Sequence, residues 1–151
     1  MLCANVNPKT IQLFNKIRPG DENIWNAIVP SADYDRGIRD VALLLPTQSD
    51  SPQGIAATGT VNQAVGGERG FSNSIHVPAL SVSELIRAKN ISNIDYLNID
   101  IEGFDEIILK EIDFSILHPL AVTVEDYSSN LIDLGSSNIT QWMHSQHYNL
   151  V

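Results

Sequence analysis

The sequence predicts an α/β domain built on a mostly parallel sheet, and three observations lead to that prediction. Short apolar runs typical of strands alternate along the chain with segments of helical spacing. The strand candidates are apolar on both faces, as expected of central parallel strands. The 151 residues are 43% hydrophobic and 18% charged, which is an ordinary globular composition and suits a single domain over residues 1–151.

The first predicted elements are a strand at residues 2–6 and a helix directly after it. Pro8 suits the first helical position, with Asn7 before it as the N-cap. Two more strands are expected at residues 24–29 and 41–47. The apolar residues expected on one face of the helix are Ile11, Phe14 and Ile17.

Residues 48–74 form the longest stretch without a helical or strand period. The stretch is rich in glycine, serine, alanine and threonine. A loop of this length inside a compact domain is usually functional or disordered. We expect a long flexible loop, and two interpretations stay open: a lid over a site, or a poorly ordered excursion.

The second half of the sequence repeats the alternation of strands and helices. Residues 75–80 are expected to be extended, and Ser81 followed by Glu84 three residues later forms a capping box that begins a helix. The remaining expected elements are a strand at residues 96–101, a helix at 104–112, a strand at 121–125, an amphipathic helix at 136–146 and a strand that begins at 148.

Charge and cysteine content exclude several classes of protein. The chain has 18 acidic and 9 basic residues, a net charge of −9, so it offers no basic patch to nucleic acid or to an anionic membrane. No apolar run approaches the roughly 20 residues of a membrane span, and the first residues do not resemble a signal peptide. The lone Cys3 cannot form an internal disulfide. We therefore expect a cytoplasmic protein without nucleic-acid or membrane partners, its oligomeric state left open.

Polar side chains follow three of the predicted strands, where an open parallel sheet binds its ligands. Gly103 would allow a tight turn between one strand and the next helix. Two interpretations of the acidic residues stay open, a ligand site or plain helix caps. The four histidines lack ligand spacing, so no metal site is predicted. The residues at the three strand ends are Asn5 and Asn7, Asp100 and Glu102, and Glu125 and Asp126.

The stretch IDYLNIDIEGFDEIILKEIDF, residues 94–114, resembles the central signature of the FkbM-type methyltransferases. That pattern runs roughly hydrophobic-Asp-hydrophobic-Leu-x-Ile-Asp-Val/Ile-Glu-Gly. Further segments resemble the same family in the same order, which together cover nearly the whole chain apart from the long loop. These segments are residues 7–29, 75–86, 120–126 and 139–151.

The resemblance implies a Rossmann-like class I methyltransferase sheet, S-adenosylmethionine as cofactor, and O-methylation of a hydroxyl on a small molecule or sugar. Asp100 would be catalytic, either orienting the acceptor hydroxyl or taking its proton. Glu102, also assigned to the catalytic group, would fix the turn or contact the substrate. The residues expected to bind the cofactor are Asn5, Asn7 and Asn26, and those expected to bind the substrate are Glu125 and Asp126.

The sequence departs from the family's pattern at both ends. The family normally begins with a strand and a glycine-rich turn, whereas this chain begins at what resembles the second strand, and it stops before the closing strand. Asn5 stands where the family usually carries an acidic residue for the ribose hydroxyls. We expect a partial domain whose sheet lacks its first and closing strands. Two interpretations stay open: a fragment of a methyltransferase, or a non-catalytic, degenerate Rossmann-like binding or interaction module.

Overall fold

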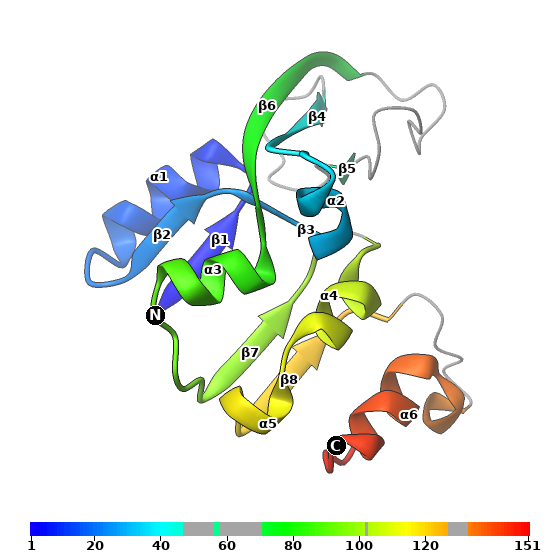
Figure 1. The fold of residues 1–151 in the computed structure, drawn as a ribbon. Coiled ribbons are helices and arrows are strands. Elements are labelled where there is room, and N and C mark those ends of the chain that lie inside the picture. The colour runs from blue at the N-terminus through cyan, green and yellow to red at the C-terminus, as the bar shows by residue number, and fades with distance from the viewer. Residues whose placement is uncertain (47–55, 58–70, 102, 127–132) are drawn as a thin grey trace. The chain divides into compact units, whose positions relative to one another are not determined.

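The computed structural model of the protein describes residues 1–46, 56–57, 71–101, 103–126 and 133–151 (Figure 1). The chain divides into two compact units, Met1–Ser81 and Val82–Val151. Each unit combines helices with small sheets, and three of the five strand pairs among the described residues are parallel. The α/β class predicted from the sequence is therefore confirmed. Among the described residues, no helix combines the length and the apolar character needed to cross a membrane.

The first unit begins with a parallel strand pair joined by a helix. Strand β1 (Leu2–Asn5) pairs with β2 (Glu22–Trp25), and α1 (Pro8–Ile17) connects them. Asn7 is the N-cap of α1 and Pro8 lies in its first turn, as predicted. Within the expected apolar face of α1, Ile11 is buried but Ile17 is exposed.

The predicted strand at residues 24–29 is two strands, so that expectation is corrected. Strand β3 (Ala27–Val29) follows β2 after a break at Asn26 and pairs in parallel with β6 (Phe71–Ser81) instead of with β1. The Asn26 side-chain amide donates to the Pro78 carbonyl of β6 at 3.2 Å. This bond attaches the break to the second sheet, and the helix α2 (Ser31–Asp35) follows β3.

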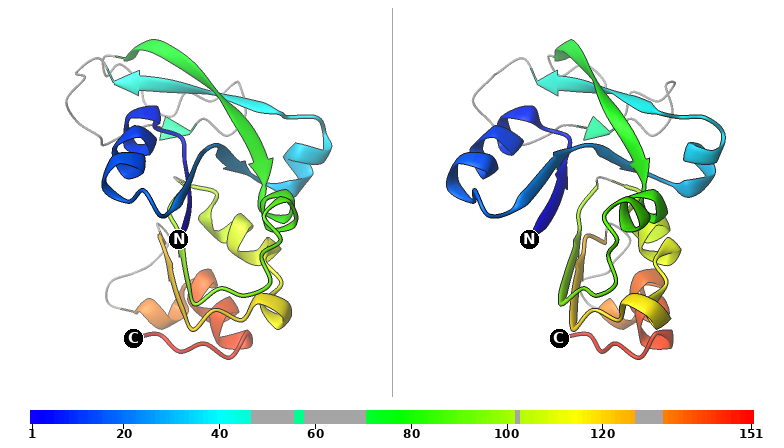
Figure 2. Two further views of the ribbon diagram at one scale, coloured as in Figure 1. Left: turned by 90° about the vertical axis from the view of Figure 1, so that its left-hand side faces the viewer. Right: turned by 60° about the vertical axis from the view of Figure 1, so that its left-hand side comes forward.

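Strand β6 is one of the two inner strands of a second sheet in the same unit, whose strand order is β3-β6-β4-β5 (Figure 2). It pairs in parallel with β3 and antiparallel with β4 (Asp40–Pro46), and β4 also pairs with β5 (Ala56–Ala57). The core of the unit forms around buried side chains of β3 and β6. Its members are Ala27 and Val77, with the partly buried Val6, Val41 and Ile75 packed against them.

Most of the predicted flexible loop at residues 48–74 lies outside the described residues. The described part departs from the prediction, because β5 lies within this range and β6 begins at Phe71, before the expected extended segment. The cause is long-range pairing: the end of β4 supplies backbone partners as far as Phe71. Such partners leave no periodic signal in a segment rich in small polar residues.

The second unit contains one parallel strand pair and several helices. Strand β7 (Tyr96–Ile99) pairs in parallel with β8 (Ala121–Val124), and the chain between them forms α4 (Asp105–Glu111) and α5 (Phe114–Leu117). The elements outside this pair are α3 (Val82–Ala88), η1 (Leu134–Ser136) and α6 (Asn138–Ser145).

The β7–β8 pair is apolar on one face only, so the expectation of two apolar faces is wrong for it. Burial alternates along both strands, with Ile99 buried and Tyr96 exposed. On the exposed face the Tyr96 hydroxyl lies 2.7 Å from the Thr123 hydroxyl, which donates to Asn98 Oδ1 at 2.5 Å. Alternation with period two explains the pattern, because successive strand residues point to opposite faces.

Helix α6 is fixed by its cap and by an aromatic cluster. Ser137 is the N-cap, as its Oγ accepts from the Thr140 N–H at 3.0 Å. The buried Phe114 ring meets Trp142 and Tyr148 edge-on, with centroids 5.2 and 5.5 Å away. The strand expected from residue 148 onwards is not formed; instead the Tyr148 hydroxyl donates to the Pro119 carbonyl.

Candidate acidic site at the strand ends

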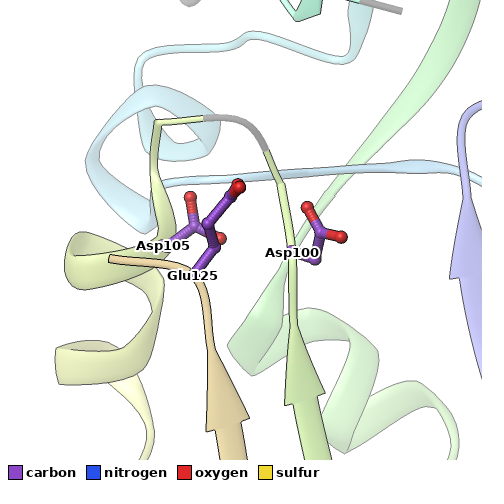
Figure 3. Close-up of side chains that lie close together, drawn as sticks. All are labelled: Asp100, Asp105 and Glu125. Atoms are coloured by element: carbon purple, nitrogen blue, oxygen red, sulfur yellow. The ribbon is translucent and has the colours of Figure 1, made fainter. Parts of the chain in front are cut away.

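Three carboxylates gather at the carboxyl ends of β7 and β8 (Figure 3). Asp100 directly follows β7, Glu125 directly follows β8, and Asp105 is the first residue of α4. One oxygen from each side chain can be chosen so that all three lie within 4.8 Å of one another. Asp100 and Asp105 lie on either side of one turn, and the pairing of β7 with β8 brings Glu125 from a later part of the chain to join them.

The register of the parallel pair places Asp100 and Glu125 side by side. Ile99 is the partner of Val124, and the main-chain N–H of Glu125 donates to the Ile99 carbonyl at 3.3 Å. The residue after each strand therefore lies at the same edge of the sheet. Both carboxylates are exposed, so a dissolved ligand can reach them.

Asp105 differs from its two neighbours because it is buried, with 3% of its surface exposed. Its Oδ1 accepts from the Ile101 N–H and its Oδ2 from the Gly103 N–H, both at 2.9 Å. Gly103 has φ +103°, a conformation that L side chains rarely adopt, so glycine is required there. The sequence interpretation missed Asp105, whose signal was an aspartate two residues after the turn glycine.

The helix-cap interpretation of Asp100 is wrong. The N-cap of α4 is Phe104, which makes no side-chain cap hydrogen bond. Glu102, predicted to belong to the catalytic group, lies outside the described residues. Asp126, predicted to bind substrate, directly follows Glu125 and is half-buried.

The asparagines predicted to bind a cofactor lie in the other compact unit, and the side chain of each makes a hydrogen bond within that unit. Asn5 Oδ1 accepts from the Asn7 N–H at 2.8 Å, and Asn7 Oδ1 accepts from the Lys9 N–H at 3.0 Å. Asn26 donates to the Pro78 carbonyl, as described above. Their role as cofactor ligands stays a prediction, as does their gathering at one sheet edge with Asp100.

The chemistry of the trio follows from its charge and exposure. Two exposed carboxylates can accept protons or hydrogen bonds from a hydroxyl, and clustered negative charge attracts a cationic ligand. Among the described residues, Asp100, Asp105 and Glu125 are also a group that could hold a hard cation, since such ions prefer oxygen ligands. Exposed acidic groups are common without an ion.

Comparison with known protein families identifies the family of the chain. The family model of the methyltransferase FkbM domain matches residues 18–150. This range contains the acidic trio and Asn26, and it begins after Asn5 and Asn7. Neither a curated protein nor a solved structure matches the chain significantly.

Proposed function

This chain belongs to the FkbM methyltransferase family, and we propose that it transfers a methyl group from S-adenosylmethionine to a hydroxyl of a small molecule or sugar. The observation that carries the proposal is the acidic trio, which lies at the ends of two parallel strands and inside the range that matches the family. Ligands of open parallel sheets bind at such strand ends. The Rossmann-like form of the sheet is part of the same proposal.

The roles of the three carboxylates follow from their burial and their partners. S-adenosylmethionine supplies a methyl group on a positively charged sulphur, which is released as a neutral thioether when an acceptor oxygen takes the methyl. Asp100 is exposed and takes the proton of the acceptor hydroxyl. Glu125, also exposed, orients the acceptor beside it. Asp105 cannot take the proton because it is buried and both its oxygens accept backbone hydrogen bonds.

The negative charge of the three carboxylates complements the positive charge of the cofactor, whereas Asn5 offers the ribose an uncharged amide. A cluster of carboxylates complements a cationic sulfonium group. Asn5 accepts from a backbone N–H through its oxygen, so the group it offers to a ribose hydroxyl is its side-chain amide donor. An amide lacks the charge assistance of a carboxylate, which predicts weaker binding than an acidic residue would give. We propose Asn7 and Asn26 as further cofactor contacts and Asp126 as a substrate contact.

The experiment that tests the proposal measures methyl transfer and cofactor binding separately. Purified protein is incubated with tritium-labelled S-adenosylmethionine and a panel of methyl glycosides, and binding of S-adenosylhomocysteine is measured by calorimetry. Asp100→Asn should lower kcat by about 10²–10⁴-fold, the usual contribution of a general base, and leave cofactor affinity nearly unchanged. Equal losses in both quantities would show instead that Asp100 binds the cofactor.

Asp95→Asn is the matched control for this variant. Asp95 directly precedes β7, at the opposite end of the strand that Asp100 follows, and it is exposed like Asp100. The substitution removes the same charge and keeps the same shape. It should leave kcat within about twofold of the original protein, because surface substitutions away from a site have small effects.

A further inference from the structure

We propose that Asp105 is the positioning residue of the acidic site: its buried carboxylate holds the turn that carries Asp100. The effect on turnover rests on the function proposed above, whereas the effect on the turn itself does not. The inference starts from the two backbone hydrogen bonds that Asp105 accepts, one from the Ile101 N–H and one from the Gly103 N–H.

The turn between β7 and α4 leaves backbone donors that need partners. The N–H groups of Ile101 and Gly103 lie between the end of β7 and the start of α4, where neither ladder nor helix bonds are available to them. Partnerless backbone groups are costly when buried, and these two donors are partly buried. Asp105 supplies both partners at 2.9 Å. In return, the two donors stabilise a carboxylate that would otherwise be costly to bury.

Aspartate suits this position for reasons of chemistry and length. A carboxylate has two acceptor oxygens, and each accepts from a different backbone N–H here. Asparagine would keep one acceptor and turn the other into a donor that faces an N–H. Glutamate would add a methylene group at a site with 3% exposure. Neither residue can reproduce both bonds without moving the turn.

The turn and the acidic trio share the same carboxylate. Asp100 is bonded through its carbonyl carbon to the Ile101 nitrogen that Asp105 holds, so a change in the turn moves Asp100. Glu125 follows β8 and is not part of the turn. Loss of the Asp105 bonds would therefore change the spacing of Asp100 and Glu125. Misplacement of a reacting group by about 1 Å costs about 100-fold in rate.

The test compares Asp105→Asn and Asp105→Ala with Asp113→Ala. Asp113 caps α5 in the same unit and makes the same kind of bond, since its Oδ1 accepts from the Ser115 N–H at 2.9 Å. Amide hydrogen exchange at Ile101 and Gly103 is measured by NMR in the full chain. In Asp105→Ala both amides should exchange at least about tenfold faster, because each loses a charge-assisted bond. In Asp113→Ala the amides of Ile101 and Gly103 should keep their exchange rates, and the faster exchange should be confined to the start of α5.

Measuring kcat and KM distinguishes a positioning role from a purely structural one, because a residue that only stabilises the fold would leave kcat unchanged in the folded variant. With tritium-labelled S-adenosylmethionine and methyl glycosides, kcat should fall about 100-fold in Asp105→Ala and less in Asp105→Asn, while the KM for S-adenosylmethionine stays within about threefold. Asp113→Ala should keep the original kcat.

The outcomes separate this inference from the proposed function. If the amides of Ile101 and Gly103 keep their protection in folded Asp105→Ala, the inference is overturned. It is equally overturned if those amides lose protection while kcat is unchanged. If the original protein transfers no methyl group to any acceptor, the proposed function on sugars fails, and the exchange data alone then decide whether Asp105 holds the turn.

Discussion

Replacing Gly103 by alanine tests whether the β7–α4 turn depends on backbone conformation. Gly103 has φ +103°, and among the described residues a Cβ built at this position meets no atom within 4 Å. A clash is therefore not expected, and the whole cost of the substitution comes from placing an L residue in a sparsely populated conformation. Other turns that tolerate positive φ without glycine rely mainly on asparagine, aspartate or histidine.

The expected cost of Gly103→Ala is about 1–3 kcal/mol, the range for residues held in sparsely populated backbone conformations. The alanine also reduces the freedom of the unfolded chain, which offsets about 0.4–1 kcal/mol of that cost. For a chain of this length, each 1 kcal/mol lost lowers Tm by about 2–4 °C. Subtracting the offset leaves a net loss of about 0–2.6 kcal/mol, and the midpoint of about 1.3 kcal/mol should lower Tm by about 3–5 °C.

The assay is urea unfolding followed by tryptophan fluorescence, with Trp142 reporting on the unit that contains Gly103. Gly135→Ala is the control in the same unit: Gly135 does not have a positive φ, and in the described part of the chain its added Cβ would meet Asp133 Oδ1 at 3.6 Å, an ordinary contact. The control should change the free energy of unfolding by less than about 0.5 kcal/mol. If Gly103→Ala is as stable as the original protein, or if Gly135→Ala loses as much stability, the backbone argument is refuted.

Two further predictions concern the packing and the charge of the second unit. Phe114→Ala should lower the free energy of unfolding by about 3–5 kcal/mol in the same urea assay, because the buried ring packs edge-on against two aromatic rings. Ile116→Ala, on the exposed side of α5, should cost less than about 0.5 kcal/mol. Similar losses in both variants would be inconsistent with this packing. The Ser115 hydroxyl and N–H, which donate to Asp113, hold the pKa of that carboxyl below its ordinary value of 3.8. The stabilising contribution of Asp113 is therefore complete above about pH 4 and is lost as the pH falls through the lowered pKa. Ser115→Ala should move the midpoint of the Asp113 carboxyl signal in a ¹³C NMR titration towards 3.8, and an unchanged midpoint would show that the hydroxyl is not the cause.

Elements controlled by local chemistry were predictable from the sequence. Asn7 and Pro8 begin α1 because an amide cap and a fixed proline φ act within one turn of chain. Ser137 caps α6 by similar local chemistry, although the sequence analysis, which expected a helix at 136–146, did not single it out. The parallel relation of β7 and β8 also followed from the alternation of elements, since a crossover of this length suits parallel strands.

Features that depend on distant partners were not predictable in the same way. The break at Asn26 exists because β2 and β3 pair with different strands, and the partner of β3 lies about fifty residues further along the chain. The early start of β6 depends on β4. The polar face of the β7–β8 pair corresponds to an alternation of period two in the sequence. The overall apolar character of the two segments instead led to the expectation of two apolar faces.

The candidate site was predictable only in part. Asp100 and Glu125 could be placed at one edge because each follows a parallel strand, and the structure brings them together. Asp105 was missed: its place two residues after the turn glycine was the available signal, and its hydrogen-bond partners are backbone groups, which leave no mark in the sequence. Whether Asn5 joins Asp100 at one edge remains a prediction.

Calorimetric titration of the purified protein with S-adenosylhomocysteine tests most directly the central claim, that this member of the FkbM family uses S-adenosylmethionine. The account predicts saturable binding of one ligand per chain, with S-adenosylmethionine competing for the same site. Binding should be retained in Asp100→Asn, whose carboxylate is assigned to the acceptor. No heat of binding at millimolar ligand, from protein that unfolds cooperatively, would contradict the claim and favour a non-catalytic binding or interaction module instead.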